Sequence, residues 1–309
     1  MVMAKAASGK PERLSIPRRL WRDRVSWLMM SPYLFFYGLM ILIPAVVSIA
    51  LSFTYFNMFS APKFVGLDNF VRMFMEDDVF MTALSNTLVA AVVIGPIGYL
   101  ISFVMAWLIN DISPRIRWLV TLIFYAPSIS GSAYVVWSFI LSPDAYGLVN
   151  SFLLKTGFIS TPLLFFQDSG QALVLVILVQ LWLSMGVGFL AFIAGLQNAD
   201  RSLYECGAID GIRSRWQELW YITLPQMKPM LLFGAVTQIA AAYAVGPVSQ
   251  ALCGFPSVDY SAHTILLHAL DYGSTRYQMG YAGAICVVLF LLVLITYKLA
   301  DFALSRVGR

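Results

Sequence analysis

The residues from 202 to 225 read Ser-Leu-Tyr-Glu-Cys-Gly-Ala-Ile-Asp-Gly-Ile-Arg-Ser-Arg-Trp-Gln-Glu-Leu-Trp-Tyr-Ile-Thr-Leu-Pro, and this stretch decides the fold. Ser202-x-x-Glu205 has the form of a capping box, so we expect a helix to begin there. Asp210-Gly211 should end that helix, because glycine accepts the backbone angles of a sharp turn.

The second half of the stretch predicts another helical segment. Trp216, Leu219 and Trp220 recur at helical spacing, and Pro225 ends the unit or opens the next helix. Long apolar segments flank the stretch on both sides. It therefore reads as helix, turn and helix between two membrane spans. On periodicity alone, an ordinary amphipathic loop at a membrane surface is the favoured interpretation.

Composition places the chain in a membrane. Of its 309 residues 60% are hydrophobic and 12% are charged, whereas a soluble domain is typically about one quarter charged. Apolar runs of about 20 residues or more favour membrane helices over a barrel. The three cysteines (Cys206, Cys253, Cys286) are scattered and suggest neither disulfides nor a metal site. The two histidines, His263 and His268, are interpreted as surface or packed residues.

Six membrane spans are expected, and a 16-to-4 division of the basic residues orients them. The spans cover about 28–54, 84–108, 116–141, 172–196, 230–252 and 279–302. Sixteen of the 20 lysines and arginines then fall on one side, which the positive-inside rule makes cytoplasmic. Both termini and the 202–225 stretch lie on that side. Kinks are expected at Gly95-Pro96 and at Pro127.

Several residues of the 202–225 stretch resemble a known motif. Glu205, Ala208, Asp210-Gly211 and the closing Ile-Thr-Leu-Pro225 are similar to the "EAA" loop of permease subunits of binding-protein-dependent ABC importers. Leu203-Tyr204 and Trp216-Gln217 are most similar to the carbohydrate-uptake, maltose-type branch. Cys206 and Gly207 stand where the family usually has two alanines.

The resemblance implies an all-α membrane protein with the type I importer permease fold of six transmembrane helices. It implies a basic cytoplasmic tail (1–27), a first helix with an outer segment (28–83), the permease core (84–302) and a cytoplasmic tail (303–309). Stretch 202–225 would be the coupling loop that docks on the ATP-hydrolysing subunit. Its expected coupling residues are Tyr204, Glu205, Ala208, Asp210, Gly211 and Pro225.

The resemblance also implies the partners. These are a second homologous permease, two ATP-binding subunits that hold ATP and Mg, an extracytoplasmic sugar-binding protein and membrane lipid, with no nucleic acid. The location would be a bacterial or archaeal cytoplasmic membrane, crossed several times. The sequence has no Walker A pattern, so no ATPase or other enzyme activity is expected of this chain.

The expected spans hold neutral polar and aromatic side chains and almost no ionisable ones, which argues against proton-coupled transport. Hydroxyl, amide and aromatic groups suit a sugar, although the same groups also join helices in membranes. The resemblance assigns sugar contacts to Tyr125, Ser128, Gln180 and Ser184, and places Thr237 and Gln238 near a third cluster. Residue chemistry adds two more, so that the full set is Tyr125, Ser128, Trp137, Gln180, Ser184, Thr237, Gln238 and Tyr243.

Two alternatives stay open at this point. The first is the same importer class with glycerol phosphate or another polar solute as cargo; a phosphate would call for arginine or lysine in the cavity, which the spans lack. The second is a membrane scaffold or an integral enzyme, for which the sequence shows no catalytic constellation.

Overall fold

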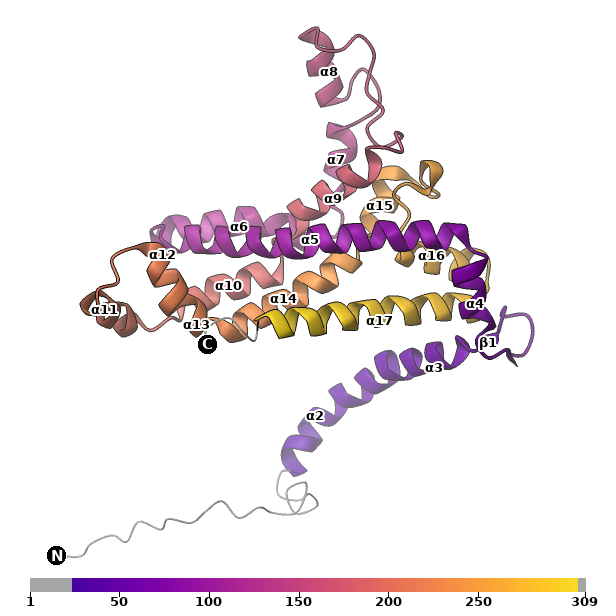
Figure 1. Cartoon of the computed structure of the whole chain (residues 1–309), viewed down its shortest axis with the longest axis horizontal. Coiled ribbons are helices and arrows are strands. Elements are labelled where there is room, and N and C mark those ends of the chain that lie inside the picture. The colour runs from indigo at the N-terminus through magenta and orange to yellow at the C-terminus, as the bar shows by residue number, and fades with distance from the viewer. Residues whose placement is uncertain (1–23, 305–309) are drawn as a thin grey trace, which may run out of the picture. The chain divides into compact units, whose positions relative to one another are not determined.

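A computed structural model describes residues 24–304 and divides the chain into two compact units, Met1–Ala50 and Leu51–Arg309 (Figure 1). In the first unit α2 (Arg24–Tyr37), η1 (Gly38–Leu42) and α3 (Ile43–Leu51) follow one another without a break. Together they give 28 helical residues, long and apolar enough to cross a membrane. None of their side chains is buried. The predicted terminal tails lie mostly outside the described residues.

The second unit is helical apart from one two-stranded ribbon. Its elements are β1 (Thr54–Tyr55), β2 (Lys63–Phe64), α4 (Asp68–Met75), α5 (Asp78–Asn110), α6 (Pro114–Ile129), α7 (Val135–Ile140), α8 (Leu148–Lys155), α9 (Ala172–Leu183), α10 (Val187–Gln197), α11 (Arg201–Ile209), α12 (Arg215–Glu218), η2 (Leu219–Thr223), α13 (Leu224–Gln226), α14 (Lys228–Tyr243), α15 (Gly246–Cys253), η3 (Val258–Tyr260), α16 (Ile265–Leu270), η4 (Asp271–Thr275) and α17 (Met279–Leu304). The two strands pair antiparallel, Thr54 with Phe64.

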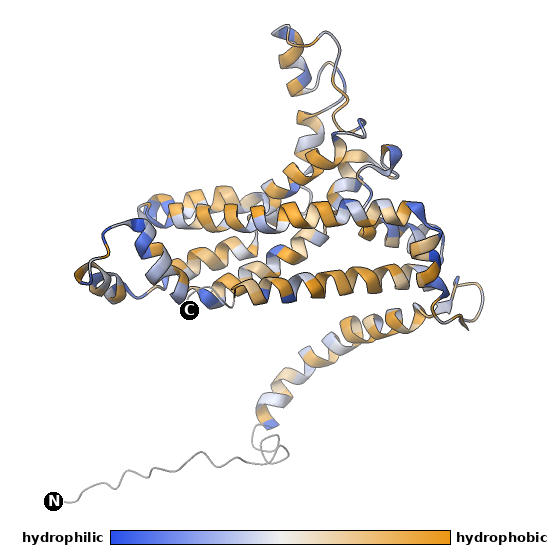
Figure 2. Cartoon of the chain, viewed as in Figure 1, coloured by the Kyte–Doolittle hydropathy of each residue, from blue (hydrophilic) through white to orange (hydrophobic). Residues whose placement is uncertain are grey.

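Helix α5 is the centre of this unit. Its 33 residues extend for about 50 Å at the α-helical rise, and it packs against α9, α10 and α14, while α14 also packs against α17. Separate apolar clusters join α5 to α9 and α15, to α10, and to α16 and α17. Figure 2 shows apolar residues along the bundle and polar residues at its two ends. The α11–α12 segment lies at one end, and α4 and α16 lie at the other (Figure 1).

Within residues 24–304 five helical stretches are long and apolar enough to span a membrane, namely 24–51, 78–110, 172–197, 228–253 and 279–304. The predicted third span, 116–141, is instead divided into the 16-residue α6 and the six-residue α7. The break follows Pro127 and contains Gly131. Helix α5 continues through Pro96, and Gly95 lies within it.

Two further spans are interrupted near their middles. The helix predicted as one span from 172 to 196 stops at Leu183 and restarts at Val187, with Gly186 between them in a non-helical conformation. The span from 228 to 253 is broken between Tyr243 and Gly246. Such breaks free backbone groups inside the bundle, where neighbouring side chains or a ligand can bind them.

Buried asparagines hold the segments that project beyond the helices. The Asn69 amide donates to the Ser52 and Thr54 carbonyls at 2.8 and 2.9 Å. Asn150, fully buried, donates to the carbonyls of Ser142 and Leu163 and accepts from the Leu163 N–H. Both asparagines thus close loops through backbone groups distant in the sequence.

Candidate functional site

The coupling segment, residues 202–225, contains the predicted helix and turn. Helix α11 begins one residue earlier than expected, and its N-cap is Asp200, whose carboxylate accepts from the Ser202 N–H at 2.9 Å. The predicted capping box at Ser202 and Glu205 is therefore wrong, because Ser202 already lies inside the helix. The hydrogen bonds from Ser202 lower the pKa of the exposed Asp200 carboxyl.

The turn after α11 follows the prediction, and a different capping box opens the next helix. Gly211 has a φ of +96°, a left-handed conformation that favours glycine. Ser214 caps α12: its hydroxyl accepts from the Gln217 N–H, and the Gln217 side chain accepts from the Ser214 N–H. The S-x-x-Q pattern at 214–217 was readable in the sequence but was missed.

Gly207 explains one departure from the EAA pattern. It is the buried residue of α11. A Cβ added to it would lie 2.6 Å from the Ile222 Cδ1 and 3.1 Å from the Ile212 Cδ1. Isoleucine at 212 and 222 thus fills the space that an alanine side chain at 207 would occupy.

Polar and aromatic contacts join the coupling segment to the bundle. The Tyr204 and Thr223 hydroxyls are hydrogen-bonded at 2.9 Å. Arg215 pairs with Asp111 in the turn between α5 and α6. In the same region the rings of Trp107, on α5, and Trp216 lie 5.3 Å apart. These contacts tie the segment to α5 and to the turn before α6.

One face of α11 is free for a partner. Glu205, Ala208 and Asp210 are exposed, and no hydrogen bond or ion pair involves the Glu205 carboxylate among the described residues. Ile209 is 86% exposed and Leu203 is 45% exposed. An unpaired carboxylate flanked by exposed aliphatic side chains at a bundle end is typical of a docking surface. Of the other predicted coupling residues, Tyr204 and Pro225 are half-buried and Gly211 is exposed.

The predicted sugar-contact residues divide into two groups. In the first, Ser128 on α6 lies beside the break between α9 and α10. A Cβ added to Gly186, in that break, would lie 3.8 Å from the Ser128 Cβ. Tyr125, one turn before Ser128, lines an open groove of about 440 Å³. Two further residues of this groove, Trp118 and Thr121, were not predicted, although they lie on the same face of α6 as Tyr125.

Two residues of the predicted set carry buried polar atoms without a hydrogen-bond partner. These are the Trp137 Nε1 and the Gln180 Oε1. The Gln180 amide nitrogen donates to the Ala241 carbonyl at 3.2 Å, and Trp137 packs edge-on against Trp182. An unpaired donor and an unpaired acceptor among apolar helices are costly unless another group binds them.

The second group joins helices. Gln238 donates to the Ile94 carbonyl at 3.2 Å, and the Tyr243 hydroxyl lies 2.7 Å from the Thr296 hydroxyl on α17. The Thr237 hydroxyl donates to the Gly234 carbonyl within α14. Ser184 bonds the Leu181 carbonyl in its own helix. The Gln238 and Tyr243 contacts hold membrane helices together, whereas the Thr237 and Ser184 hydroxyls are bound within their own helices. The part of these four residues in sugar binding stays a prediction.

Known proteins match this chain over most of its length. The family model described as "Binding-protein-dependent transport system inner membrane component" matches residues 98–307. The chain belongs to this family. It is therefore the membrane permease component of an ABC transport system that works with a binding protein.

Similar permeases serve several cargoes. The "Probable ABC transporter permease protein YesP" of Bacillus subtilis (strain 168) is 30% identical over 92% of this chain and 93% of that protein. The "Lactose transport system permease protein LacF" of Rhizobium radiobacter is 34% identical over 70% and 71%. The "sn-glycerol-3-phosphate transport system permease protein UgpA" of Yersinia pestis bv. Antiqua (strain Antiqua) is 31% identical over 75% and 77%.

Solved structures show the same fold. A bacterial ABC transporter "involved in the import of the acidic polysaccharide alginate" contains a chain that matches with a TM-score of 0.74 and 22% identity, over 95% of this permease and 99% of that chain. The alginate transporter in complex with its "alginate pentasaccharide-bound periplasmic protein" matches with a TM-score of 0.75, also at 22% identity.

Removal of one oxygen atom tests the hydrogen bond between the Tyr204 and Thr223 hydroxyls in the permease's coupling segment. Tyr204→Phe removes the hydrogen bond to Thr223, which we expect to destabilise the segment by about 1 kcal/mol. Hydrogen exchange of α11 should then be about fivefold faster, because 1 kcal/mol corresponds to about that factor in an opening equilibrium. Tyr221→Phe, at a ring that is 68% exposed, is the matched control. Equal exchange in both variants would contradict the assigned contact.

Proposed function

We propose that this chain is one of two permease subunits of an ATP-driven importer, and that its cargo is an oligosaccharide delivered by an extracytoplasmic binding protein. The observation that carries the proposal is a combination of two sites in one bundle. Glu205, whose carboxylate is exposed and has no partner among the described residues, lies on a short helix at one end, and the neutral side chain of Ser128 lies beside the α9–α10 break inside the bundle. The lactose permease relative supports a sugar as cargo.

In the proposed topology the chain crosses a bacterial cytoplasmic membrane six times with both termini inside. Helices α6 and α7 together supply the third crossing, and the 16-to-4 distribution of basic residues supports the orientation. Separate ATP-binding subunits hold ATP and Mg and dock on α11. A second homologous permease completes the cavity, and ATP hydrolysis belongs to the separate subunits.

The proposed mechanism follows from the contacts of the coupling segment. Closure of the ATP-binding subunits displaces α11, because a basic group of the ATP-binding subunit binds the Glu205 carboxylate on this helix. Tyr204–Thr223 carries this displacement to the start of α14, and Arg215–Asp111 carries it to the turn between α5 and α6. Helix α6 bears Tyr125 and Ser128, so the cavity opens or closes as the ATP-binding subunits do.

A second cargo is supported by the glycerol phosphate relatives, of which one is 31% identical. A phosphate would require a cationic group, and the groove beside Tyr125 contains Arg117. One terminal nitrogen of that guanidinium donates to the carbonyls of Asn110 and Ile112 at 2.6 and 3.0 Å, where it closes the end of α5, whereas its Nε is buried without a hydrogen-bond partner among the described residues. We favour a sugar because the predicted contact residues carry neutral hydroxyl, amide and aromatic groups.

Substitution of Tyr125 tests the cargo site. In the complete complex in proteoliposomes, Tyr125→Ala should reduce sugar uptake at least about tenfold, because an aromatic face that stacks on a sugar contributes more than about 1 kcal/mol. Tyr221→Ala, at an exposed ring outside the groove, is the control. Unchanged uptake by Tyr125→Ala, with normal complex assembly, would remove Tyr125 from the cargo site. Faster uptake of glycerol phosphate than of any sugar would favour the second cargo.

A further inference from the structure

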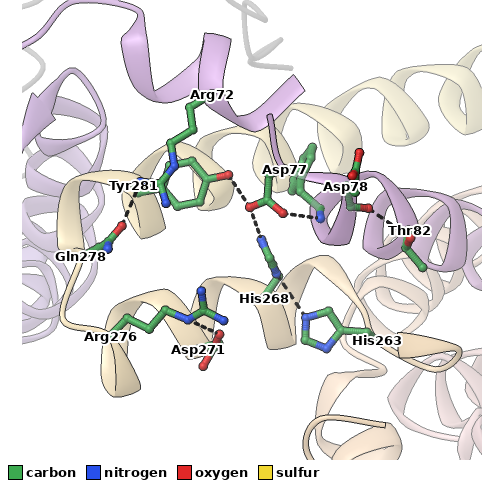
Figure 3. Close-up of polar contacts among 11 residues, drawn as sticks. Arg72, Asp77, Asp78, Thr82, His263, His268, Asp271, Arg276, Gln278 and Tyr281 are labelled. Carbon is green, nitrogen blue, oxygen red and sulfur yellow. Dashed lines mark hydrogen bonds and ion pairs between the residues drawn. The ribbon is translucent and has the colours of Figure 1, made fainter. Parts of the chain in front are cut away.

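The end of the bundle opposite the coupling segment contains a buried chain of titratable side chains that the importer function does not use. We define the histidine chain as Asp77, His268 and His263 (Figure 3). The Asp77 carboxylate lies 3.0 Å from the His268 Nε2, and the His268 Nδ1 lies 3.2 Å from the His263 Nε2. Both histidines are 2% exposed. The chain joins residues 191 positions apart, at the start of α5 and in the 254–278 segment.

Other groups fix Asp77 as the acceptor at one end. The Tyr281 hydroxyl at the start of α17 donates to it at 2.7 Å, and the Phe80 N–H donates at 2.9 Å. Burial alone would raise the pKa of Asp77, but the hydrogen bonds from His268 and Tyr281 outweigh it and hold this pKa well below its ordinary value. The carboxylate is therefore ionised and bonds helices α5, α16 and α17 at one point.

The hydrogen-bond directions follow from this fixed acceptor. His268 donates through its Nε2–H to Asp77, so its Nδ1 carries a lone pair when the ring is neutral. That lone pair accepts the Nε2–H of His263. The remaining atom, the His263 Nδ1, is buried and has no hydrogen-bond partner among residues 24–304. The imidazole packs against the rings of Phe255 and Tyr260, whose centroids lie 5.7 and 5.4 Å from its own.

An added proton has no favourable position in this arrangement. On the His263 Nδ1 it forms a buried N–H without an acceptor. On the His268 Nδ1 it faces the N–H of His263, unless that proton moves to Nδ1 and is again unpaired. Each case also adds a buried positive charge.

The charged groups around the chain do not remove this conflict. Arg72 on α4 lies over the rings of Tyr281 and Tyr272 at 4.5 and 5.6 Å. Arg276 lies over Tyr272 at 4.4 Å and pairs with Asp271 at 2.8 Å. The second acidic side chain of the site, Asp271, is thus already bound to an arginine. Both arginines lie over tyrosine rings, Arg72 over Tyr272 and Tyr281 and Arg276 over Tyr272.

We infer that the histidine chain is an acid-sensitive latch, which ties the 254–278 segment to α5 and α17 while His263 is neutral and releases it when this end of the bundle is acidified. The latch is a property of the fold. Its position on the outer face rests on the topology of the proposed function, so external acid would loosen the outer rim without reaching the coupling segment.

The sign and the pH window of the effect follow from His263. Burial lowers its pKa from 6.5 to about 4. The closed form therefore binds fewer protons than the open form between these values. The contribution of neutral His263 to the stability of the closed form is fully present above pH 6.5. It is lost as the pH falls from 6.5 towards 4. A single site of this kind raises the opening equilibrium by roughly 30-fold from pH 7.5 to pH 5.

Hydrogen exchange on the assembled complex, at pH 7.5, 6 and 5, tests the latch without any transport assay. After correction for intrinsic exchange rates, peptides from 254–278 should open roughly 30-fold more at pH 5 than at pH 7.5, and peptides from α8, which has no histidine, should not. His263→Gln keeps a donor to His268 but does not titrate. In this variant the opening of the 254–278 segment should therefore not change with pH. Asp77→Asn should open the segment at every pH, whereas the exposed neighbour Asp78→Asn should not.

If the opening of the 254–278 segment in the wild-type protein does not change with pH, the latch is overturned. The same holds if His263→Gln shows the same pH dependence of opening as the wild-type protein. If that variant does not fold, deuterium exchange at the imidazole carbons of the wild-type protein measures both histidines directly. A His263 that titrates between pH 6 and 7 would also overturn it. None of these outcomes depends on the cargo, so failure of the latch leaves the proposed importer function standing.

Discussion

Glu205→Arg is expected to separate this permease from its ATP-hydrolysing partner. The carboxylate is exposed on α11 and has no partner among the described residues. Reversal places a like charge against the basic group that we expect it to meet, which at a buried interface costs about 2–5 kcal/mol. Retention of the ATP-binding subunits on purification should fall at least about 30-fold, the factor to which 2 kcal/mol corresponds. Sugar-stimulated ATP hydrolysis should fall with it.

Glu76→Arg is the matched control, because Glu76 is an exposed carboxylate that follows α4 at the opposite end of the bundle. It should leave the association with the ATP-binding subunits unchanged. Full assembly and full hydrolysis in Glu205→Arg would show that this carboxylate makes no contact that matters to coupling.

Gly280→Ala is expected to destabilise the protein far more than the same substitution at Gly95. A Cβ at this first turn of α17 would lie 2.0 Å from the Thr54 carbonyl oxygen and 3.1 Å from the Phe56 nitrogen. Both are backbone atoms, so the ribbon must move away and the Gly280 N–H to Phe56 carbonyl hydrogen bond of 3.2 Å is lost. We expect a destabilisation of about 1–3 kcal/mol, measured as a lower midpoint of thermal unfolding in detergent.

The control for this substitution is Gly95→Ala in α5, where no atom lies within 4 Å of the added Cβ. Alanine there should be neutral or stabilise by up to about 1 kcal/mol, because it reduces the freedom of the unfolded chain. An equal effect of the two variants would contradict the close packing of α17 against β1.

The spans were predictable where apolar length alone determines them. Span six was expected at 279–302 and α17 covers Met279–Leu304; span five was expected at 230–252, and α14 with α15 covers 228–253. The Asp210-Gly211 turn was also predicted correctly, because a positive φ is favourable for glycine. Long runs and glycine turns are local properties, so a sequence carries them without knowledge of the fold.

The helix breaks were not predictable in the same way. Nothing in the hydropathy of 172–196 distinguishes a continuous helix from one that stops at Leu183. The prediction of a capping box at Ser202 failed because Asp200, two residues earlier, caps the helix by accepting from the Ser202 N–H, so Ser202 itself lies in the first turn. Where two capping residues are close, the packing of the following helix decides between them.

The histidine chain shows what a sequence cannot reveal. His263 and His268 were interpreted as surface or packed residues with no acidic residue between them, and both are buried. Their acidic partner, Asp77, lies 191 residues away and reaches them only because α5 and α16 meet at the same end of the bundle. Likewise, the proximity of Gly186 to Ser128 depends on how α6 packs against the α9–α10 break.

ATP hydrolysis by the complex that co-purifies with this chain tests the central claim most directly. It is measured with and without the binding protein and a panel of oligosaccharides, with glycerol phosphate included. The account predicts that one sugar-loaded binding protein stimulates hydrolysis, and that Glu205→Arg abolishes the stimulation. A pure preparation with no ATP-binding subunit and no hydrolysis would contradict it, because α11 would then not be a coupling helix.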